Sequence, residues 1–472
     1  MKEKTILTVS NVIAMILELI AARIMSPYIG SSNTVWTIVI GLMLLGNALG
    51  NYYGGKLADK YDTSKLNSVI LSISALATWV IYIVHNAILT VTGFSYGIPV
   101  LLLLITIPCI GIGMISPVVS KRLMQKDNNG KTAGLIFTLI TVGSLIGTFL
   151  GGFVIIPKLG SNNIICYMAV ILAVLSIVEI LPRLMYKRST LHFVLNTGLI
   201  ICIIFSRFMI GSHQDNFLIF DTRDNYIRIY DDVLPETNEK IKVFQMSGGF
   251  SSAIYTDKNK QNELVFPYLR AYDDILISNG ISDKTAYLMI GGAGYTFPRY
   301  LLSHYDDKTI DVIELDEDVE KIAREYYGFE EYITKYSDRL GLYTDDGRMF
   351  VSETDNKYDV VLNDAFSGDV PARTLATKEA VHEIHGVLNE KGIYMSNVIG
   401  SPDDDFIKNE FKTIASEFEY VWLVHAGEMN TEYTNYIIVA SDYDYKIKGV
   451  SCNINDAELY TDDYSPVDYL DY

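Results

Sequence analysis

Hydrophobic residues are distributed very unevenly along the chain. Up to about residue 210 they form seven apolar runs, each close to the 20 residues or so that cross a bilayer as a helix. The runs lie near 5–25, 35–53, 67–88, 98–118, 133–156, 163–182 and 191–210. Soluble core helices rarely occur as seven consecutive long apolar runs. This half of the chain therefore predicts a membrane α-helical bundle of about seven spans.

Beyond residue 213 the pattern becomes that of a soluble protein. Residues 214–275 alternate polar and apolar positions, as in YIRIYDD and KIKVFQM, which predicts short antiparallel strands. From Ala286 on, short apolar strands alternate with helical stretches such as Asp316–Tyr327, which predicts a parallel, doubly wound sheet. We therefore expect three domains: a transmembrane helical domain (1–212), a small β-strand domain (213–278) and a doubly wound α/β domain (279–472).

Two of the apolar runs carry glycine at every fourth position. These glycines are Gly46, Gly50 and Gly54 in the second run and Gly143, Gly147 and Gly151 in the fifth. The spacing lines one face of a helix with glycine, so that neighbouring backbones can approach closely in lipid. We expect these faces to pack tightly in a compact bundle.

The two halves differ in charge. Up to His213 there are 15 Lys and Arg against 6 Asp and Glu, whereas the remainder has 23 against 50. Basic residues follow the second, fourth and sixth runs, and almost none follow the first and third. The positive-inside rule therefore places these basic connections in the cytoplasm, together with the N-terminus and its Lys2 and Lys4.

Two arguments disagree about the side of the membrane on which the soluble half lies. With the N-terminus in the cytoplasm, seven complete crossings would leave the soluble half outside the cell. A catalytic domain that uses a substrate from inside the cell would instead have to lie in the cytoplasm. Because such a substrate is available inside the cell, we predict a multi-pass protein of the cell membrane with a cytoplasmic catalytic domain.

Ionisable residues within the apolar runs leave two interpretations open. Glu18 and Arg23 lie in the first run and Glu179 near the end of the sixth. Such residues are costly at membrane depth and usually face a partner or a polar cavity, so either an ion pair or a substrate path fits.

Cys452 is the only cysteine of the soluble half, which excludes a disulfide within it, and no cysteine–histidine spacing predicts a metal site.

The most specific local pattern lies in residues 286–316. An apolar strand (Tyr287–Ile290) runs into a turn that contains Gly291, Gly292 and Gly294. A second strand ends at Glu314, close to the spacing at which a carboxylate reaches a nucleoside ribose. Because glycine allows the backbone to approach a ligand closely, this pattern predicts nucleoside binding over a simple tight connection.

Polar residues follow the successive strands of the predicted sheet. They are Glu314 and Asp316, then Asp345, Asp346 and Gly347, then Asn363 and Asp364, and Asn397 in the next strand. The carboxyl ends of parallel strands meet in one crevice, so we expect these side chains to converge there. Clustered carboxylates suit a cationic ligand such as a sulfonium or an amine. They suit phosphate badly, and we expect no nucleic-acid partner.

The order of motifs along this half resembles that of the spermidine synthase superfamily. The motifs are GGAGY, VIELD, DDGRMF, YDVVLNDAF and PARTL, and the C-terminal TDDYSPVDYL fits the branch fused to a multi-spanning membrane domain. The resemblance covers roughly residues 214–472 and implies a Rossmann-like methyltransferase fold preceded by a small β domain. It also implies that S-adenosylmethionine, commonly in its decarboxylated form, is a substrate and not a tightly bound cofactor. An aminopropyl group would pass to an amine, with release of methylthioadenosine.

The resemblance assigns roles to the cofactor-binding residues. Gly291 and Gly292 would line the nucleoside turn, Glu314 would bind the ribose hydroxyls and Asp346 would accept from the adenine amino group. Gly294, Asp316 and Gly347 complete this predicted set.

The resemblance makes Asp364 the catalytic residue. Its carboxylate would orient the attacking amine and receive its proton. The candidate substrate-binding residues are Tyr268, Ser251, Tyr295 and Asp369.

Several positions depart from the family pattern and keep three functions open. Gly294 replaces an aspartate near the aminopropyl tail, Ser367 replaces a second aspartate, and Phe266, Pro267 and Tyr268 occupy the positions of a tyrosine–histidine–glutamate stretch.

The predicted function is an aminopropyltransferase. The alternatives are an enzyme that acts on S-adenosylmethionine alone and a transport or sensing protein that binds the nucleoside without catalysis. We expect a small-molecule substrate and a lipid bilayer as partners, and a homo-oligomer stays open.

Overall fold

The computed structural model divides the chain into two compact units. The membrane unit is Met1–Phe217 and the soluble unit is Leu218–Tyr472. The described residues are 2–29, 33–89, 97–126, 129–184, 190–211, 217–222, 224–235, 237–247, 249–281, 283–367, 370–427 and 434–467.

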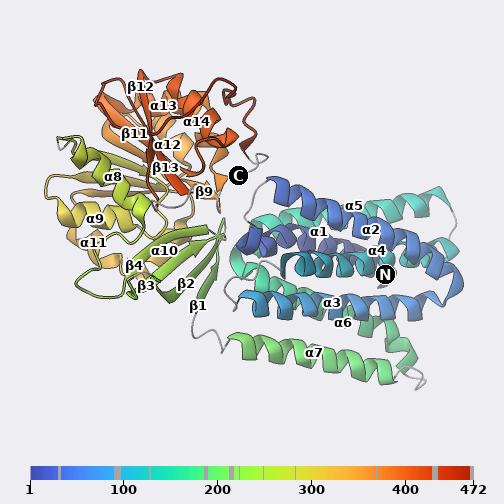
Figure 1. Ribbon diagram of the computed structural model, residues 1–472. Coiled ribbons are helices and arrows are strands. Elements are labelled where there is room, and N and C mark those ends of the chain that lie inside the picture. Colours follow the sequence, from blue (N-terminus) through green and yellow to red (C-terminus); the bar gives the residue numbers. More distant parts are fainter. Residues whose placement is uncertain are drawn as a thin grey trace. The chain divides into compact units, whose positions relative to one another are not determined.

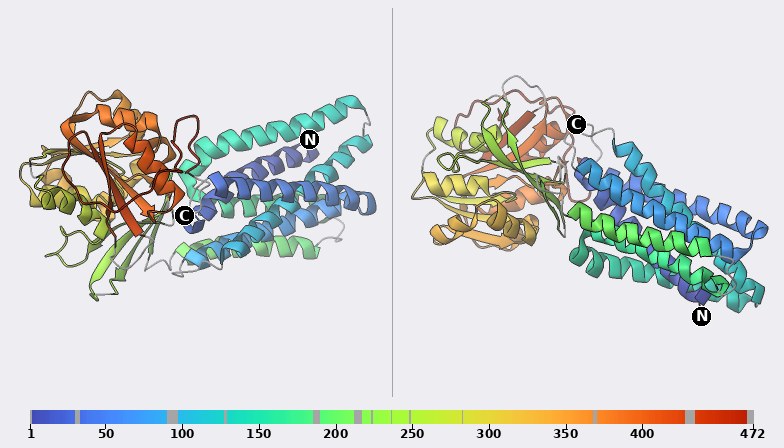
Figure 2. Two further views of the ribbon diagram at one scale, coloured as in Figure 1. Left: turned by 45° about the horizontal axis from the view of Figure 1, so that its top comes forward. Right: turned by 90° about the horizontal axis from the view of Figure 1, so that it is seen from below.

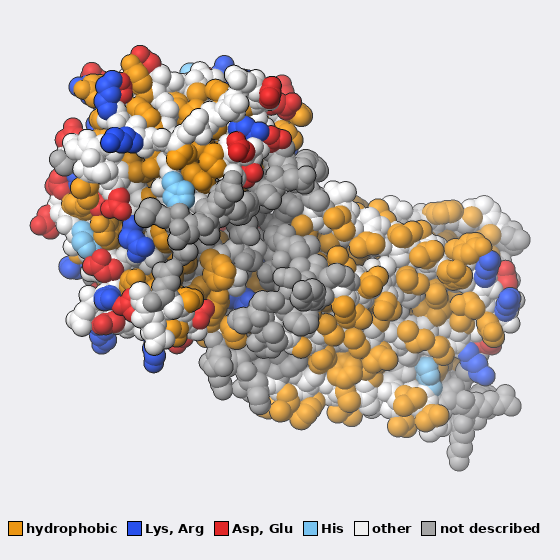
Figure 3. Space-filling view, viewed as in Figure 1, with side chains coloured by type: hydrophobic (Ala, Val, Ile, Leu, Met, Phe, Trp, Pro, Cys, Tyr) orange, Lys and Arg blue, Asp and Glu red, His pale blue; other side chains and the backbone are white. Residues whose placement is uncertain are grey.

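Seven helices in the described part of the membrane unit are long and apolar enough to cross a membrane (Figure 1). They are α1 (Lys2–Ile29), α2 (Asn33–Lys60), α3 (Thr63–Leu89), α4 (Gly97–Lys126), α5 (Gly130–Leu150), α6 (Ile156–Leu184) and α7 (Thr190–Gly211). A turn of π-helix (Gly151–Ile155) follows α5, and Gly160 interrupts α6 with a φ of 70°. Hydrophobic side chains cover the visible face of these helices (Figure 3). The predicted bundle of apolar helices is confirmed.

The glycine faces pack as the spacing predicts. A Cβ atom at Gly50 of α2 would lie 2.3 Å from the carbonyl oxygen of Ile110 on α4. A Cβ atom at Gly147 of α5 would lie 2.6 Å from the carbonyl oxygen of Val12 on α1. Gly41, outside the triplet on α2, has nothing within 4 Å of that position. Backbone contact between helices therefore depends on the two glycine triplets.

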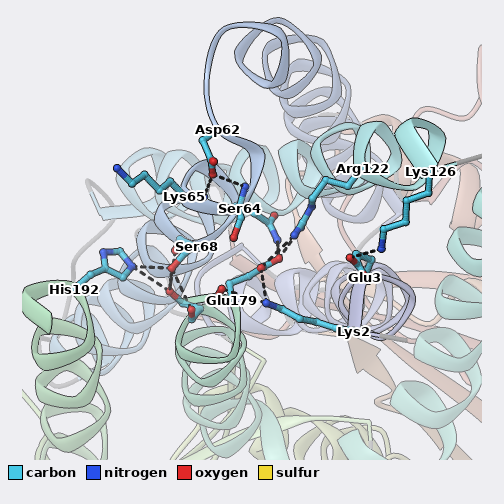
Figure 4. A network of polar contacts seen from close by, with 12 residues as sticks. Lys2, Glu3, Asp62, Ser64, Lys65, Ser68, Arg122, Lys126, Glu179 and His192 are labelled. Carbon is cyan, nitrogen blue, oxygen red and sulfur yellow. Dashed lines mark hydrogen bonds and ion pairs between the residues drawn. The ribbon is translucent and has the colours of Figure 1, made fainter. Parts of the chain in front are cut away.

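A buried ion pair joins four helices near the N-terminal end of α1 (Figure 4). The Glu179 carboxylate of α6 is fully buried and accepts hydrogen bonds from Arg122 of α4 at 2.6 and 3.2 Å. Lys2 of α1 lies 2.9 Å from the same carboxylate, and Asn67 of α3 donates to it at 2.8 Å. Of the two interpretations for Glu179, the structure shows the ion pair.

Helix α7 runs from this end of the bundle to the other. Near its start, the His192 ring nitrogen lies 2.9 Å from the Ser68 hydroxyl of α3, beside the Glu179 network (Figure 4). Near its end, Arg207 donates to Asn163 in the first turns of α6 at 2.8 Å. The chain therefore leaves α7 at the end of the bundle opposite to Lys2.

The soluble unit begins with a four-stranded sheet in the order β1–β2–β3–β4. Its strands are β1 (Phe217–Asp221), β2 (Tyr226–Val233), β3 (Lys240–Met246) and β4 (Gly249–Tyr255). β3 pairs antiparallel with both β2 and β4, as the alternating pattern predicts.

A seven-stranded sheet follows, in the order β12–β13–β11–β8–β5–β6–β7. Its strands are β5 (Ala286–Ile290), β6 (Thr309–Glu314), β7 (Leu340–Thr344), β8 (Tyr358–Asn363), β11 (Leu388–Gly400), β12 (Tyr420–His425) and β13 (Thr434–Ser441). All seven predicted strands are present. The expectation of a wholly parallel sheet is wrong for β13, which pairs antiparallel with β11 and β12. Only eight residues separate β12 from β13, too few for the crossover that a parallel pair needs.

Helices cover both faces of this sheet (Figures 1 and 2). They are α8 (Pro267–Ser278), α9 (Thr296–His304), α10 (Glu317–Tyr326), α11 (Glu330–Lys335), α12 (Gly347–Glu353), α13 (Lys378–Gly386) and α14 (Asp405–Ala415). The short strands β9 (Phe366–Ser367) and β10 (Val370–Pro371) and a 3₁₀ turn (Arg373–Leu375) complete the described elements.

Helix α8 belongs by packing to the large sheet. Tyr272 and Leu276 of α8 share a buried cluster with Met289 of β5 and Ile393 of β11. A domain boundary ahead of Pro267 would fit this packing better than the predicted division at residue 278, which stays a prediction.

Candidate active site

A cavity of about 530 Å³ lies at the carboxyl ends of the parallel strands. β5 and β8, which border it, are neighbours at the point where the strand order reverses, the usual ligand site of such sheets. The small sheet, the start of α8, and the segment from β9 to the 3₁₀ turn also contribute to its lining. Seven of the predicted site residues line it: Ser251, Tyr268, Gly291, Glu314, Asp346, Gly347 and Asp364.

The glycine turn after β5 is shaped by a close contact with the end of β8. Gly291 has a φ of 96°, and a Cβ atom there would lie 2.4 Å from the carbonyl oxygen of Asp364. Any side chain would force the two strand ends apart. Gly291 therefore brings the turn and Asp364 to the same point of the cavity.

Glu314, at the end of β6, holds the turn in place. One carboxylate oxygen accepts the N–H groups of Gly292 at 2.9 Å and Ala293 at 3.2 Å, and the other accepts that of Asp316 at 3.2 Å. Burial raises the pKa of Glu314, although these three donors oppose that shift. The carboxylate has about four acceptor positions, so a ribose hydroxyl can still bind to it.

The other end of the turn faces away from the cavity. Tyr295 is 1% exposed and stacks on Phe329 with ring centroids 4.5 Å apart. The Gly294 N–H donates to the Ser252 hydroxyl at 3.1 Å, and a Cβ atom at Gly294 would lie 2.6 Å from the Tyr327 ring. Tyr295 has a left-handed backbone and is not among the residues that line the cavity, and its predicted substrate contact stays a prediction.

Asp316 also lies away from the cavity lining. It caps α10 by accepting the Asp318 N–H at 3.1 Å, and it accepts hydrogen bonds from Thr222 and, at 3.2 Å, from Asn225. Asp316 is 1% exposed and joins the β1–β2 turn to the large sheet. Its contacts support the fold, and the predicted cofactor contact of Asp316 stays a prediction.

Asp346 and Gly347 lie at the start of α12. The Asp346 carboxylate caps this helix by accepting the N–H groups of Arg348 at 2.8 Å and Met349 at 3.3 Å. A Cβ atom at Gly347 would lie 2.4 Å from the Ile290 side chain, so the helix start fits closely against β5. Both residues line the cavity, where a base could approach.

Asp364 is a buried acid of the cavity lining at the end of β8. It accepts hydrogen bonds from Asn397 at 2.8 Å and from the Tyr268 hydroxyl at 3.4 Å. Burial raises its pKa from 3.8 to about 7, against the effect of these two donors. A carboxylate with this pKa can both hold a cation and take up a proton near neutral pH.

Asn435 belongs to the site, and the sequence analysis missed it. Its amide donates to Asn397 at 3.0 Å, so a chain of amides supports Asp364. Because β13 is antiparallel, its first residues lie at the edge of the cavity. The short connection before β13 was the sequence signal that could have predicted this direction.

The predicted substrate-binding residue Asp369 lies outside the described residues.

The cavity is strongly acidic. Five carboxylates line it, and no Lys, Arg or His does so among the described residues: Asp224, Glu314, Asp345, Asp346 and Asp364. Such a lining favours cations and opposes anions.

The strand order and the cavity at the strand-order reversal define a Rossmann-like α/β domain of the methyltransferase type. Residues 274–425 match the family model described as the spermine/spermidine synthase domain. The soluble unit therefore contains a spermine/spermidine synthase domain, and the resemblance seen in the motifs is confirmed.

Individual proteins match parts of the chain. The polyamine aminopropyltransferase of Vibrio vulnificus is 24% identical over 208 residues, 43% of this chain and 65% of that protein. The polyamine aminopropyltransferase of Streptococcus uberis is 33% identical over 128 residues, 27% of this chain and 44% of that protein. The chain thus spans less than two thirds of either relative. The structure of a probable spermidine synthase from Corynebacterium glutamicum is 22% identical, with a TM-score of 0.40, over 48% of this chain and 80% of that one.

The raised pKa of Asp364 predicts a pH-dependent cost to stability. Its folded-state pKa of about 7 is above its ordinary value of 3.8, so the free energy of unfolding falls as the pH rises from about 4 to about 7. Asp364→Asn should raise the free energy of unfolding by about 2–4 kcal/mol at pH 8 and change it little at pH 4. Thermal unfolding of the full chain in detergent at both pH values measures this.

Asp355→Asn, at an exposed position, is the control and should melt like the wild type at both pH values. A lower melting temperature of Asp364→Asn at pH 8 would contradict the burial of this charge.

Proposed function

We propose that the soluble unit transfers an aminopropyl group from decarboxylated S-adenosylmethionine to an amine and releases methylthioadenosine. The observation that carries the proposal is Asp364, a buried carboxylate fixed by Asn397 and Tyr268 beside the glycine turn of a cavity lined by acids. A sulfonium and an amine are the cationic partners that such a cavity favours.

The proposed reaction is a displacement at the carbon next to the sulfonium. The amine nitrogen forms a bond to this carbon while the carbon–sulfur bond breaks, and its electron pair neutralises the sulfonium. Asp364 orients the amine and accepts the proton that it loses, for which a pKa of about 7 is well suited. Much of the acceleration would come from holding donor and acceptor in line.

The nucleoside part of the donor would bind at the carboxyl ends of β5 and β6. Glu314 would bind the ribose hydroxyls beside Gly291 and Gly292, and Asp346 with Gly347 would contact adenine. Tyr268 and the main chain of Ser251, linked at 3.2 Å, border the reaction point.

A second candidate is an enzyme that acts on S-adenosylmethionine alone, which Gly294 supports because it leaves the tail without its usual acid. The charge of the cavity opposes this candidate. S-adenosylmethionine carries a carboxylate, which would add a further negative charge to a lining of five acids.

Product identification tests the proposal. Purified full-length protein is incubated with S-adenosylmethionine or its decarboxylated form, each with and without putrescine. We expect methylthioadenosine only from the decarboxylated donor together with the amine. Methylthioadenosine from S-adenosylmethionine alone would establish the second candidate instead, and donor binding without any product would favour a non-catalytic protein.

We also propose that α1–α7 span a lipid bilayer and that the soluble unit lies outside the cytoplasm. Seven crossings put the two termini on opposite sides. All Lys and Arg up to His213 except Arg23, Lys158 and Arg207 belong to the N-terminal segment or to the ends and connections after α2, α4 and α6. The positive-inside rule then places these connections in the cytoplasm. Substrate supply favours the cytoplasm instead, so in the orientation proposed from the charges the donor and the amine would have to reach the soluble unit on the outer side of the membrane.

Cysteine labelling in intact cells tests the orientation. In a chain with all four native cysteines replaced by serine, Lys448→Cys adds an exposed thiol to the soluble unit and Lys60→Cys adds one at the end of α2. A membrane-impermeant maleimide should label Lys448→Cys in intact cells and Lys60→Cys only after permeabilisation. The reverse pattern would place the soluble unit in the cytoplasm.

A further inference from the structure

We infer that the acceptor in this cavity is a primary monoamine with an apolar chain, and not a diamine. The inference rests on the proposed function, which requires an amine and leaves its class open. It is carried by the distribution of charge among the described residues of the cavity lining, because the carboxylates other than Asp364 lie on one side of it.

The order of the strands gives the cavity two sides. β5, β6 and β7 lie on one side of β8, and β11 and β13 lie on the other. The nucleoside of the donor is proposed to bind at the ends of β5 and β6, which makes this the donor side. In a displacement the amine approaches the carbon from the direction opposite to the departing sulfur, so the acceptor would lie on the side of β11 and β13.

Four of the five carboxylates in the described lining lie on the donor side. Glu314 ends β6, and Asp345 and Asp346 follow the end of β7. The residue after Asp224 is bonded at 3.2 Å to the carboxylate of Asp316, just beyond β6. The fifth carboxylate is that of the proposed catalytic acid, which follows the end of β8 and so lies between the two sides.

The wall that β11 and β13 contribute is made of amides and an aliphatic side chain. Asn397 of β11 donates to Asp364 at 2.8 Å, and Asn435 of β13 donates to Asn397 at 3.0 Å. Ile399 lies two residues after Asn397, on the same face of the sheet, and is the register partner of Asn435. Beyond the two amides, an acceptor bound at Asp364 would therefore meet the half-buried side chain of Ile399.

Aromatic side chains complete the lining near Asp364. α8 packs against β13 and carries Tyr268, whose hydroxyl donates to Asp364 at 3.4 Å. Phe266, just before α8, stacks on Tyr268 with ring centroids 6.1 Å apart. Phe366 lies two residues after Asp364 and also lines the cavity. These three rings and Ile399 make the acceptor side apolar.

This lining distinguishes a monoamine from a diamine. The reacting nitrogen of either would bind at Asp364, and the chain behind it would extend along Ile399 and the aromatic rings. An apolar chain end gains from leaving water there. A second ammonium would lose its hydration, and the described residues of this side supply no carboxylate to pair with it, which is costly.

The total charge of the cavity predicts the opposite preference. An acidic cavity attracts a dication more strongly than a monocation. A preference for the monoamine would therefore report the local lining of the acceptor side and not the charge of the cavity as a whole.

A pair of acceptors of equal length tests the inference. n-Pentylamine has a methyl group where putrescine has its second ammonium. The full-length protein in detergent is given decarboxylated S-adenosylmethionine with each amine, and release of methylthioadenosine is followed. We expect kcat/KM to be higher for n-pentylamine than for putrescine by about tenfold or more. Putrescine keeps one reactive nitrogen and should still give product, more slowly.

Two substitutions at one position test the assigned wall. Ile399→Asp adds a carboxylate where the second ammonium would lie, and should raise kcat/KM for putrescine relative to n-pentylamine by about tenfold or more. Ile399→Asn is the matched control, since it has nearly the same shape without the charge, and should give no such gain. Equal gains in the two variants would contradict the placement of the chain end at Ile399.

Failure of the inference and failure of the proposed function give different results. A higher kcat/KM of the wild-type protein for putrescine would overturn the inference and leave the proposed function intact. No product from either amine would contradict the proposed function. The inference can still be tested in that case by calorimetric binding of both amines to the protein with methylthioadenosine, where tighter binding of putrescine would overturn it.

Discussion

The close approach of Gly291 to the main chain of Asp364 is the constraint on which the site depends. A single added carbon at Gly291 would lie 2.4 Å from the Asp364 carbonyl oxygen, so β5 and β8 could not keep their present spacing. This contact brings the glycine turn against Asp364, the proposed catalytic residue. Asn397 of β11 then donates to the Asp364 carboxylate, and Asn435 of β13 donates to Asn397. The burial that raises the pKa of Asp364 follows from the same closeness.

The membrane unit relies on different interactions. For helices that span a bilayer, as we propose for α1–α7, the hydrophobic effect does not drive association, and the glycine faces of α2 and α5 allow backbone contact with α4 and α1. The buried Glu179 carboxylate adds a specific link between four helices through Arg122, Lys2 and Asn67. Breaking such a pair by removing one partner is costly, which favours one arrangement of the helix ends.

Periodicity and composition predicted the elements of both units, because helix length in a bilayer and strand alternation are local properties. The seven apolar helices, three of the four strands of the small sheet, the seven strands of the large sheet and the glycine faces at Gly50 and Gly147 could be found this way. The direction of β13 was missed, since strand pairing depends on the connection and not on the strand's own residues. Asp316 and Tyr295 were assigned to ligands on motif position alone. Their contacts with Thr222 and Phe329 are long-range, and no local pattern contains them.

The central claim is that Asp364 is a buried carboxylate whose charge is stabilised by a cationic substrate. Proton release on binding tests it most directly, through calorimetry in buffers of different ionisation enthalpy. With a pKa of about 7, Asp364 is about half protonated at pH 7, and a bound cation should lower this pKa. Binding of decarboxylated S-adenosylmethionine should therefore release about half a proton at pH 7 and more at pH 6. Methylthioadenosine, or the donor with Asp364→Asn, should release none. Equal proton release by the wild type and Asp364→Asn, or no release by the wild type, would contradict the account.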